Sequence, residues 1–274
     1  MTLGVLCEDP ALAGAIGRLE GVDEIYCAAA PAGRRARWIQ TLPYITRTAA
    51  DLRPGGKNIS GFPVPDPDAA GFLVRGLDGL EYILESGTDR EVIADAALYT
   101  MNKRAALHLL DNGVSRLTLP YEIDRKSMIS RGEAEHSCLV LYGRIPLMIS
   151  AQCYFKNSGL KCRAPDKGKG EDITFLRDRK GVSFPVKRFC AECTNVIYNS
   201  VPLSLHRDIK AVMAFAPSSV RLDLTTEPEK EAMKIVKYYV NLIRRAASGE
   251  DLKELTEAPP FCAYTRGHFG KGVL

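Results

Sequence analysis

Short apolar runs alternate with amphipathic stretches along most of the chain. The runs are rich in residues that favour strands, and the stretches between them carry apolar residues at helical spacing. The pattern predicts eight strands, at Leu3–Cys7, Glu24–Cys27, Trp38–Leu42, Gly71–Val74, Glu91–Ala94, Arg116–Leu119, Cys138–Leu141 and Val220–Leu224. It predicts helices at Pro10–Leu19, Leu77–Leu84, Asn102–Leu110 and Glu227–Ala247, with a stop signal at Asn112-Gly113 and with Pro228 in a first turn.

Eight strands that alternate with helices indicate parallel βα units closed into a barrel. We therefore expect an α/β protein, a single (β/α)8 TIM-like barrel over residues 1–274. Between Leu147 and Val220 no regular βα repeat is visible, and Lys156–Lys180 is rich in Gly, Lys, Arg and Asp. A long irregular segment in a compact domain is usually functional or disordered. We predict an insertion between strands 7 and 8, at about residues 150–215.

The positions that directly follow the strands are the first candidates for chemistry, because β/α barrels place their active sites at the carboxyl ends of the strands. These positions are Arg75, Asp95, Tyr121, Glu122, Tyr142, Arg144 and Thr225. Asp95 and Glu122 are predicted to do acid/base work, with Tyr142 as a further catalytic candidate. Arg144 and Arg179 are predicted to hold an anionic group, since guanidinium binds carboxylate or phosphate bidentately. Each of these residues alternatively forms an ordinary ion pair or helix cap.

Composition and charge exclude some classes of protein. Hydrophobic residues make up 46% of the 274 residues, which excludes wholesale disorder. The balance of 37 basic against 33 acidic residues gives a net charge of +4, too small to indicate nucleic acid by itself. The N-terminus lacks the features of a signal peptide, and the apolar runs are too short to span a membrane. We expect a soluble, cytoplasmic protein.

Eight cysteines are present, and four of them fall in the predicted insertion. Cys153, Cys162, Cys190 and Cys193 form a C-x8-C pair, a gap of 27 residues and a C-x2-C pair. Thiolates are soft ligands that bind iron–sulfur clusters or zinc, and a cytosolic protein keeps its thiols reduced. Structural zinc sites prefer two short knuckles, so the spacing favours iron–sulfur over zinc.

The other four cysteines have different expected roles. Cys7, Cys27 and Cys138 lie in apolar strands and are predicted to be core residues. Cys262 lies in the tail and is an alternative ligand if one of the chosen four is wrong.

Several local runs resemble peptidase family U-32, the collagenase-like peptidases, especially between Tyr142 and Asn199. The runs are Leu119–Glu122, Tyr142–Met148, Ala151–Cys153, Leu176–Gly181, Phe184–Val186, Cys190–Cys193, Ile197–Ser200 and Tyr264–Phe269. Before Gly71 the chain departs from the usual family opening, with Val5–Pro10 where a Pro-Ala-Gly turn is usual. In this respect the chain is similar to the second barrel of the family's longer members.

The resemblance implies an enzyme with a [4Fe-4S] cluster. Family members resemble oxygen-independent hydroxylases that act on RNA bases or quinone precursors. Carried over by position, the cluster ligands are Cys153, Cys162, Cys190 and Cys193. The resemblance also leaves open a partner barrel or a homo-oligomer.

Two alternatives remain open at this point. The first is a metal-dependent peptidase, although the chain has no HExxH or GxSxG motif and its four histidines form no close pair in sequence. The second is a non-catalytic RNA-binding or partner subunit. Its basic runs would be Arg34–Arg37, Lys167–Lys169 and Arg177–Lys180.

Overall fold

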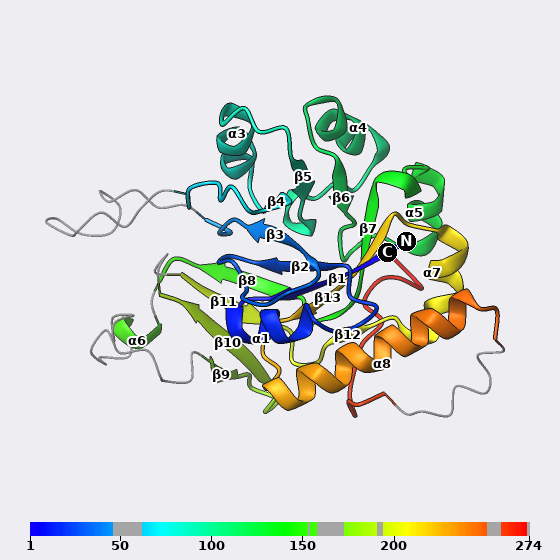
Figure 1. The fold of residues 1–274 in the computed structure, drawn as a ribbon. Coiled ribbons are helices and arrows are strands. Elements are labelled where there is room, and N and C mark those ends of the chain that lie inside the picture. Colours follow the sequence, from blue (N-terminus) through cyan, green and yellow to red (C-terminus); the bar gives the residue numbers. More distant parts are fainter. Residues whose placement is uncertain (46–61, 153, 158–172, 191–193, 251–258, 273–274) are drawn as a thin grey trace, which may run out of the picture.

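A closed barrel of eight parallel strands forms the body of the protein, with helices packed around it (Figure 1). The computed structural model describes residues 1–45, 62–152, 154–157, 173–190, 194–250 and 259–272. The barrel strands are β1 (Thr2–Cys7), β2 (Glu24–Cys27), β3 (Arg37–Thr41), β4 (Gly71–Val74), β5 (Glu91–Ala94), β6 (Arg116–Thr118), β7 (Ser137–Gly143) and β13 (Ser219–Leu224). They pair in sequence order, and β13 closes the barrel between β7 and β1. The predicted fold class is confirmed.

The helices form the outer layer. Four of them agree with the apolar spacing, and the helices at Arg125–Arg131 and Ile209–Phe215 were not predicted. The outer helices are α1 (Pro10–Ile16), α3 (Leu77–Glu85), α4 (Lys103–Asp111), α5 (Arg125–Arg131), α7 (Ile209–Phe215) and α8 (Glu229–Ala247). The α8 helix begins at Glu229 rather than Glu227 because Pro228, with φ −60° and ψ 152°, is its N-cap residue. Asn102 caps α4, and Gly113 follows this helix with φ +92°.

Two apolar clusters hold the barrel together. The larger lies between strands and helices, and it includes Val5, Phe72, Val220 and Val236. The smaller contains Leu6, Tyr26, Ile39, Leu73 and Ile93. Along each strand, these five residues alternate with residues of the larger cluster, so their side chains point to the other face of the sheet. That face is the inside of the barrel.

A glycine makes room for the largest ring inside the barrel. A Cβ atom at Gly4 would lie 2.6 Å from Cε2 of Tyr26, which is far closer than packed carbon atoms approach each other. Tyr26 is completely buried. The pairing of β1 with β2 aligns Gly4 with Glu24 and Leu6 with Tyr26, so the ring leans across the glycine.

The segment between β7 and β13 contains a second, smaller sheet. Its strands are β8 (Pro146–Ser150), β9 (Ile173–Arg177), β10 (Ser183–Phe189) and β11 (Thr194–Tyr198), in the antiparallel order β8-β11-β10-β9. We call it the insertion sheet; Figure 1 shows it beside one end of the barrel, together with α6 (Tyr154–Asn157). After it, β12 (Leu203–Ser204) pairs with β7, and α7 packs against α8.

A local sequence signal marks the turn between β9 and β10. Oδ1 of Asp178 accepts hydrogen bonds from the backbone N–H groups of Lys180 and Val182, both at 2.8 Å, and Gly181 has φ +82°. Asp and Gly between two strand-like runs are typical of such a hairpin. Within the described residues, no helix has the length and apolar character needed to cross a membrane.

Candidate functional site at the barrel mouth

A pocket of about 330 Å³ lies where the carboxyl ends of the barrel strands meet the insertion sheet. We call this end of the barrel the mouth. Strands β3, β4, β5 and β6 lead into one side of the pocket, and β8 forms the other. The lining residues are Tyr44, Arg75, Asp95, Ala96, Ala97, Tyr99, Tyr121, Glu122, Pro146, Leu147, Met148 and Ile149. This is the position where β/α barrels place their active sites.

Buried charges form the floor of the mouth. Arg221 is 1% exposed; its Nη2 lies 2.8 Å from Oδ1 of Asp95, and its Nε lies 2.6 Å from Oδ1 of Asp223. Nε of Arg75 lies 3.2 Å from Oδ2 of Asp95. The guanidinium groups of Arg75 and Arg221 therefore hold Asp95 between them.

The surroundings of Asp95 keep it ionised. Burial alone would raise the pKa of its carboxyl group, but the charges of Arg221 and Arg75 oppose this, and the net result is a pKa below the ordinary value of 3.8. The Arg221 side chain and the backbone N–H of Ala96 also donate hydrogen bonds to Asp95. A carboxylate stabilised in this way is a weak base.

Three tyrosines supply aromatic surface around the pocket. The Tyr44 ring centroid lies 4.2 Å from Cζ of Arg75, which is a cation–π contact. The hydroxyl of Tyr121 donates a hydrogen bond of 3.1 Å to Oδ2 of Asp223. Tyr99 is 59% exposed and has left-handed backbone angles of φ 50° and ψ 48°. Such angles are unfavourable for a residue other than glycine, and they are often found at functional sites.

Two further side chains of the insertion sheet, outside β8, lie at the mouth. Nζ of Lys187, from β10, lies 3.2 Å from Oε2 of Glu8 and donates a hydrogen bond of 2.9 Å to the carbonyl of Thr225. Tyr198, from β11, is 1% exposed. Its pKa is raised well above the usual value, first by burial and then by the charges of neighbouring groups.

Three buried polar atoms in this region have no hydrogen-bond partner among the described residues. They are Nη2 of Arg75, the hydroxyl of Tyr198 and Oγ1 of Thr225. Buried polar groups in proteins are nearly always paired, and exceptions are expected where a ligand or water binds. The mouth is therefore the best candidate for a binding site.

Of the residues predicted for catalysis, the structure brings Asp95 and Glu122 together in the pocket lining. Tyr142 and Arg144 are not among the lining residues. Tyr142 is buried beside Tyr239 and Phe261, and its hydroxyl donates to Oε1 of Glu227 at 3.0 Å.

Arg144 instead contacts two segments of the chain that do not line the pocket. Its Nε donates to Oγ1 of Thr226 at 2.9 Å, and its Nη1 donates to the carbonyls of Asn199 and Ser200. It thus joins the end of the insertion sheet to the segment after β13. Arg179 lies in the exposed turn between β9 and β10.

The three cysteines that were predicted to be core residues are buried. They are Cys7, Cys27 and Cys138, and burial raises the pKa of the Cys7 thiol to about 12. Of the predicted cluster ligands, Cys190 directly follows β10 and is half-buried. Cys153, Cys162 and Cys193 lie outside the described residues. The part of the chain that the structure describes contains no group of three or more His, Cys, Asp or Glu side chains that could hold a metal ion.

The sequence reasoning did not assign a role to Tyr44, Tyr99, Lys187, Arg221 or Asp223. The last two had a usable signal: Arg and Asp at positions 221 and 223 alternate with apolar residues in an otherwise buried strand. In a barrel strand, such alternation places both side chains inside the barrel. No local sequence pattern marks Tyr44, Tyr99 or Lys187, because contacts across the fold bring them to the site.

A second hollow, of about 540 Å³, lies between α5 and the C-terminal tail. It is lined by Asp124, Arg125, Lys126, Ile129, Gly270 and Lys271. It shares no lining residue with the mouth pocket, and Asp124 is engaged as the cap of α5. We therefore place the functional site at the mouth.

The fold defines the chain as a (β/α)8 barrel protein, and the pocket is a candidate binding site at its mouth. No family model matches the chain, and neither does any curated protein. A search of solved structures finds the "C-terminal domain of putative chitinase" from Desulfitobacterium hafniense DCB-2, at 10% sequence identity and a TM-score of 0.39. The match covers 89% of this chain and 99% of that domain. We draw no functional conclusion from this likeness.

Proposed function

We propose that this protein is an iron–sulfur enzyme, similar to members of peptidase family U-32, that hydroxylates a planar ring without molecular oxygen. The ring is that of an RNA base or a quinone-like aromatic compound. The single observation that carries the proposal is that one strand, β8, serves both parts of such an enzyme. It lines the mouth pocket with Pro146–Ile149, and the chain that leaves it leads to Cys153.

The register of the insertion sheet brings together the described strand ends that adjoin three of the cysteines in sequence. Ser150 of β8 pairs with Asn195 of β11, and Phe189 of β10 pairs with Thr194 of β11. These paired residues are the ends of their strands on one side of the sheet. Cys190 directly follows Phe189, Cys193 directly precedes Thr194, and Cys153 comes three positions after Ser150.

The donor set fits an iron–sulfur cluster by its chemistry, because four thiolates are the usual ligands of a [4Fe-4S] centre. We propose Cys153, Cys162, Cys190 and Cys193 as those ligands, with zinc as the competing metal. When bound, such a cluster supplies electron transfer and a reactivity tuned by hydrogen bonds and exposure. The protein supplies binding and orientation of the ring.

The pocket residues are suited to bind a single ring. A volume of about 330 Å³ is at the lower end of the range for small-molecule sites. Tyr44, Tyr99 and Tyr121 offer aromatic surface, and Leu147 and Met148 offer apolar surface from the opposite side. An extended peptide would need a longer groove, which disfavours the peptidase alternative.

A serine–histidine pair exists, but its setting does not suit a peptidase. Oγ of Ser204 lies 2.7 Å from Nδ1 of His206 and 2.6 Å from the hydroxyl of Tyr239. Ser204 is completely buried, and it lies on β12 rather than in the mouth. A nucleophile must be able to reach its substrate.

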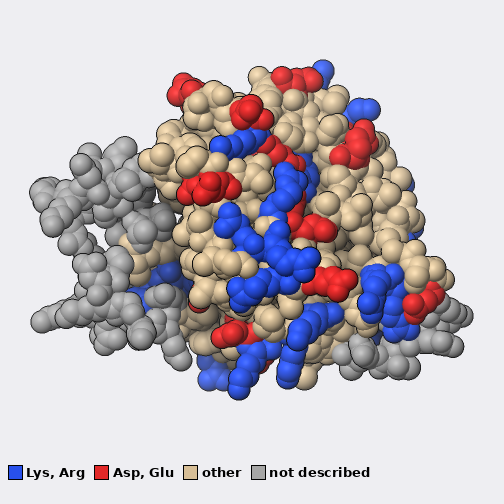
Figure 2. Space-filling model, viewed as in Figure 1, with Lys and Arg blue, Asp and Glu red and all other residues tan. Residues whose placement is uncertain are grey.

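The basic run Arg34–Arg37 gives little support to a simple RNA-binding role. Arg37 is engaged with Glu24 and Glu91, and the guanidinium of Arg34 lies over the ring of Trp38. Figure 2 shows basic side chains gathered near the middle of the face that it draws, with acidic side chains among and around them. Such a mixed surface produces a weaker field than a continuous basic patch.

Anaerobic purification with measurement of the visible spectrum, iron, sulfide and zinc tests the cofactor. We expect broad absorption near about 400 nm and about four irons per chain. A colourless protein that holds one zinc ion would overturn the iron–sulfur proposal. Protein with the expected cluster is then assayed for hydroxylation of RNA and of quinone precursors, and for cleavage of casein and gelatin as the peptidase alternative.

A matched pair of cysteine variants tests the ligands. Cys190→Ser should lose the cluster, because a hydroxyl group is a poor soft ligand. Cys27→Ala should keep the iron content and the spectrum, because Cys27 is a buried core residue. Full iron content in the Cys190→Ser protein would show that the ligand assignment is wrong.

A further inference from the structure

We propose that Arg75 anchors the substrate through a neutral carbonyl oxygen, and that the charge balance of the mouth selects neutral rings over anionic ones. The inference rests on the proposed function in one respect, namely that the mouth pocket is the substrate site. It names the substrate class more narrowly, as a planar ring that carries an uncharged carbonyl group.

One nitrogen of the Arg75 guanidinium has no hydrogen-bond partner among the described residues. Its Nε contacts Oδ2 of Asp95 at 3.2 Å, and its Nη1 donates to the carbonyl of Leu42 at 3.5 Å. Nη1 also lies 3.9 Å from Oε1 of Glu8. Nη2 has no partner among the described residues, although the side chain is only 4% exposed and lines the pocket. A buried N–H donor of this kind requires an acceptor.

The charges around Arg75 argue against an anionic acceptor. The charges that matter belong to residues that line the pocket, to their ion-pair partners and to the further partners of those groups. Among the described residues, the cations of this set are Arg75, Lys187 and Arg221. The carboxylates of the same set are Glu8, Asp95, Asp223 and Glu122, so four negative groups face three positive ones. An incoming carboxylate would add a fifth negative charge beside Asp95 and Glu8.

A neutral carbonyl avoids this repulsion. Its oxygen accepts the hydrogen bond from Nη2 and adds no net charge to a poorly solvated site. The ring that carries it would pack near Tyr44, whose own ring already stacks on the Arg75 guanidinium. Asp95 then acts as a positioning residue, because its bonds to Arg75 and Arg221 orient the guanidinium that binds the ligand.

Two small probes of equal shape separate the neutral and anionic possibilities. Benzamide presents a neutral carbonyl on an aromatic ring, and benzoate presents a carboxylate on the same ring. We expect the protein, titrated with each probe and followed by ligand-observed NMR, to bind benzamide about tenfold more tightly than benzoate. Equal or tighter binding of benzoate would overturn the charge argument, and absence of saturable benzamide binding would overturn the site.

Three variants locate the binding to Arg75. Arg75→Met should weaken benzamide binding at least about tenfold, whereas Arg75→Lys, which keeps the charge, should recover part of it. Arg37→Met is the matched control at the other end of the barrel, and it should bind benzamide as the wild type does. If Arg75→Met fails to fold, as judged by circular dichroism, Arg75→Lys alone carries the test through a reduced affinity for benzamide. Unchanged binding in both Arg75 variants would contradict the proposal.

Asp95→Asn gives a readout that a structural role alone would not produce. It removes one carboxylate and preserves shape, so the charges become three against three. We expect the affinity for benzoate relative to that for benzamide to rise about tenfold, even if weaker positioning of Arg75 lowers both affinities. A parallel loss of both affinities, with no change in their ratio, would show that Asp95 only maintains structure, and the charge-balance proposal would be wrong.

The cofactor and the ligand site can fail separately. The Cys190→Ser protein, colourless under the proposed function, should still bind benzamide. A colourless wild-type protein that binds benzamide would refute the iron–sulfur proposal and leave the Arg75 inference standing. A brown protein that does not bind benzamide would refute the Arg75 inference and leave the iron–sulfur proposal standing.

Discussion

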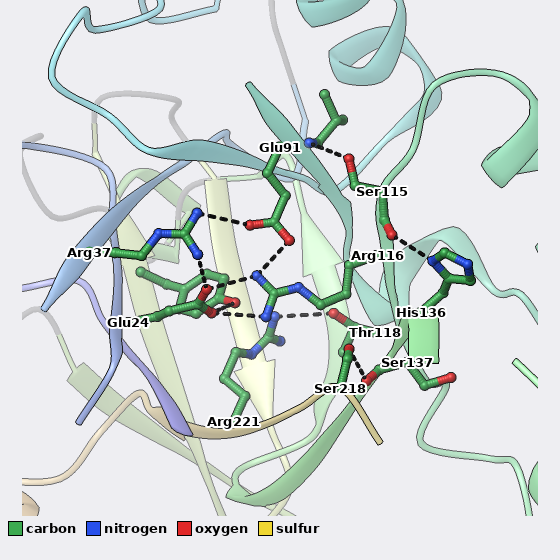
Figure 3. Close-up of polar contacts among 12 residues, drawn as sticks. Glu24, Arg37, Glu91, Ser115, Arg116, Thr118, His136, Ser137, Ser218 and Arg221 are labelled. Carbon is green, nitrogen blue, oxygen red and sulfur yellow. Dashed lines mark hydrogen bonds and ion pairs between the residues drawn. The ribbon is translucent and has the colours of Figure 1, made fainter. Parts of the chain in front are cut away.

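The two ends of the barrel use the same residue types for different purposes. At the amino-terminal end of the strands, both carboxylate oxygens of Glu24 accept hydrogen bonds of 2.9 Å from Arg116, and Tyr26 donates another of 2.8 Å (Figure 3). Arg37 and Glu91 complete the cluster. At the mouth, Arg75, Asp95 and Arg221 form a comparable set of ion pairs.

The two sets differ in what lies beside them. At the lower end, Glu24 is 1% exposed and has a partner at each oxygen, although Nε of Arg116 has no hydrogen-bond partner among the described residues. The mouth lies against a pocket and retains three buried polar atoms that lack partners among the described residues. Buried polar atoms without a described partner thus occur at both ends, and the mouth differs because its unpartnered atoms lie near a pocket that a ligand can enter.

Tyr26 connects the two sets. Its hydroxyl donates to Glu24, and its ring centroid lies 5.4 Å from Cζ of Arg221. Charged and polar side chains thus run through the barrel from one end to the other, where an apolar filling is more usual. Changes at the lower end and at the middle should therefore differ in how far they disturb the mouth.

The largest effect is expected from Arg116→Met. This change leaves Glu24 buried with only the half-exposed Arg37 as a cationic partner. We expect the free energy of unfolding to fall by about 3–5 kcal/mol, because an incompletely paired buried charge is costly. Urea denaturation measures the loss. A decrease below about 1 kcal/mol would show that the lower cluster does not stabilise the barrel.

A smaller effect is expected from Gly4→Ala, in the middle of the barrel. The added methyl group would meet the Tyr26 ring at 2.6 Å, where packing on all sides prevents easy relief. We expect a loss of about 1–3 kcal/mol in the free energy of unfolding. The double variant Gly4→Ala/Tyr26→Leu should be more stable than the sum of the two single changes predicts. Simple additivity would argue against the contact.

The pH dependence of the free energy of unfolding should reveal the ion pairs of Asp95. Its folded-state pKa lies below the unfolded value of 3.8, so the folded form binds fewer protons between those two values. Its contribution to stability is therefore fully present above the unfolded pKa and is lost as pH falls through the folded pKa. Asp95→Asn should show a shallower loss of stability on acidification, measured by urea denaturation at a series of pH values. Identical slopes would contradict the assigned ion pairing.

The smallest effect is expected from Arg37→Met. The side chain of Arg37 is 55% exposed, and its contacts with Glu24 and Glu91 are 3.3 and 3.4 Å long. Exposed ion pairs contribute about 0.2–1 kcal/mol, so the unfolding midpoint should shift little. Comparison with Arg116→Met then measures what burial adds to the same carboxylate partners.

Much of the barrel is predictable from local pattern. The eight predicted strands coincide with β1–β7 and β13, because each barrel strand is a short buried run bounded by polar turns. The insertion sheet was not predicted. Its strands are half-exposed and mix apolar with charged residues, as in Ser183–Phe189. The apolar residues therefore show neither a clear helical period nor a clear strand period. Only the Asp178–Gly181 turn offered a local signal.

The candidate site was predictable in part. Asp95 and Glu122 follow barrel strands, and this position alone indicates the mouth. Tyr142 and Arg144 follow a strand as well, yet their side chains contact Glu227 and Thr226 outside the pocket. Whether a residue after a strand turns inward depends on the packing of its loop, and sequence position does not specify that.

The sequence by itself determined the number of barrel strands, four of the outer helices and the core cysteines, because each depends on local period or residue chemistry. The cluster ligands stay a prediction. Only the tertiary structure decided that Arg221 meets Asp95, 126 positions away, and that Arg75 keeps a buried nitrogen without a described partner. Closure of the barrel brings distant strands side by side, and the insertion sheet then covers the mouth. Contacts of that range depend on the register of the strands around the barrel, which no single segment encodes.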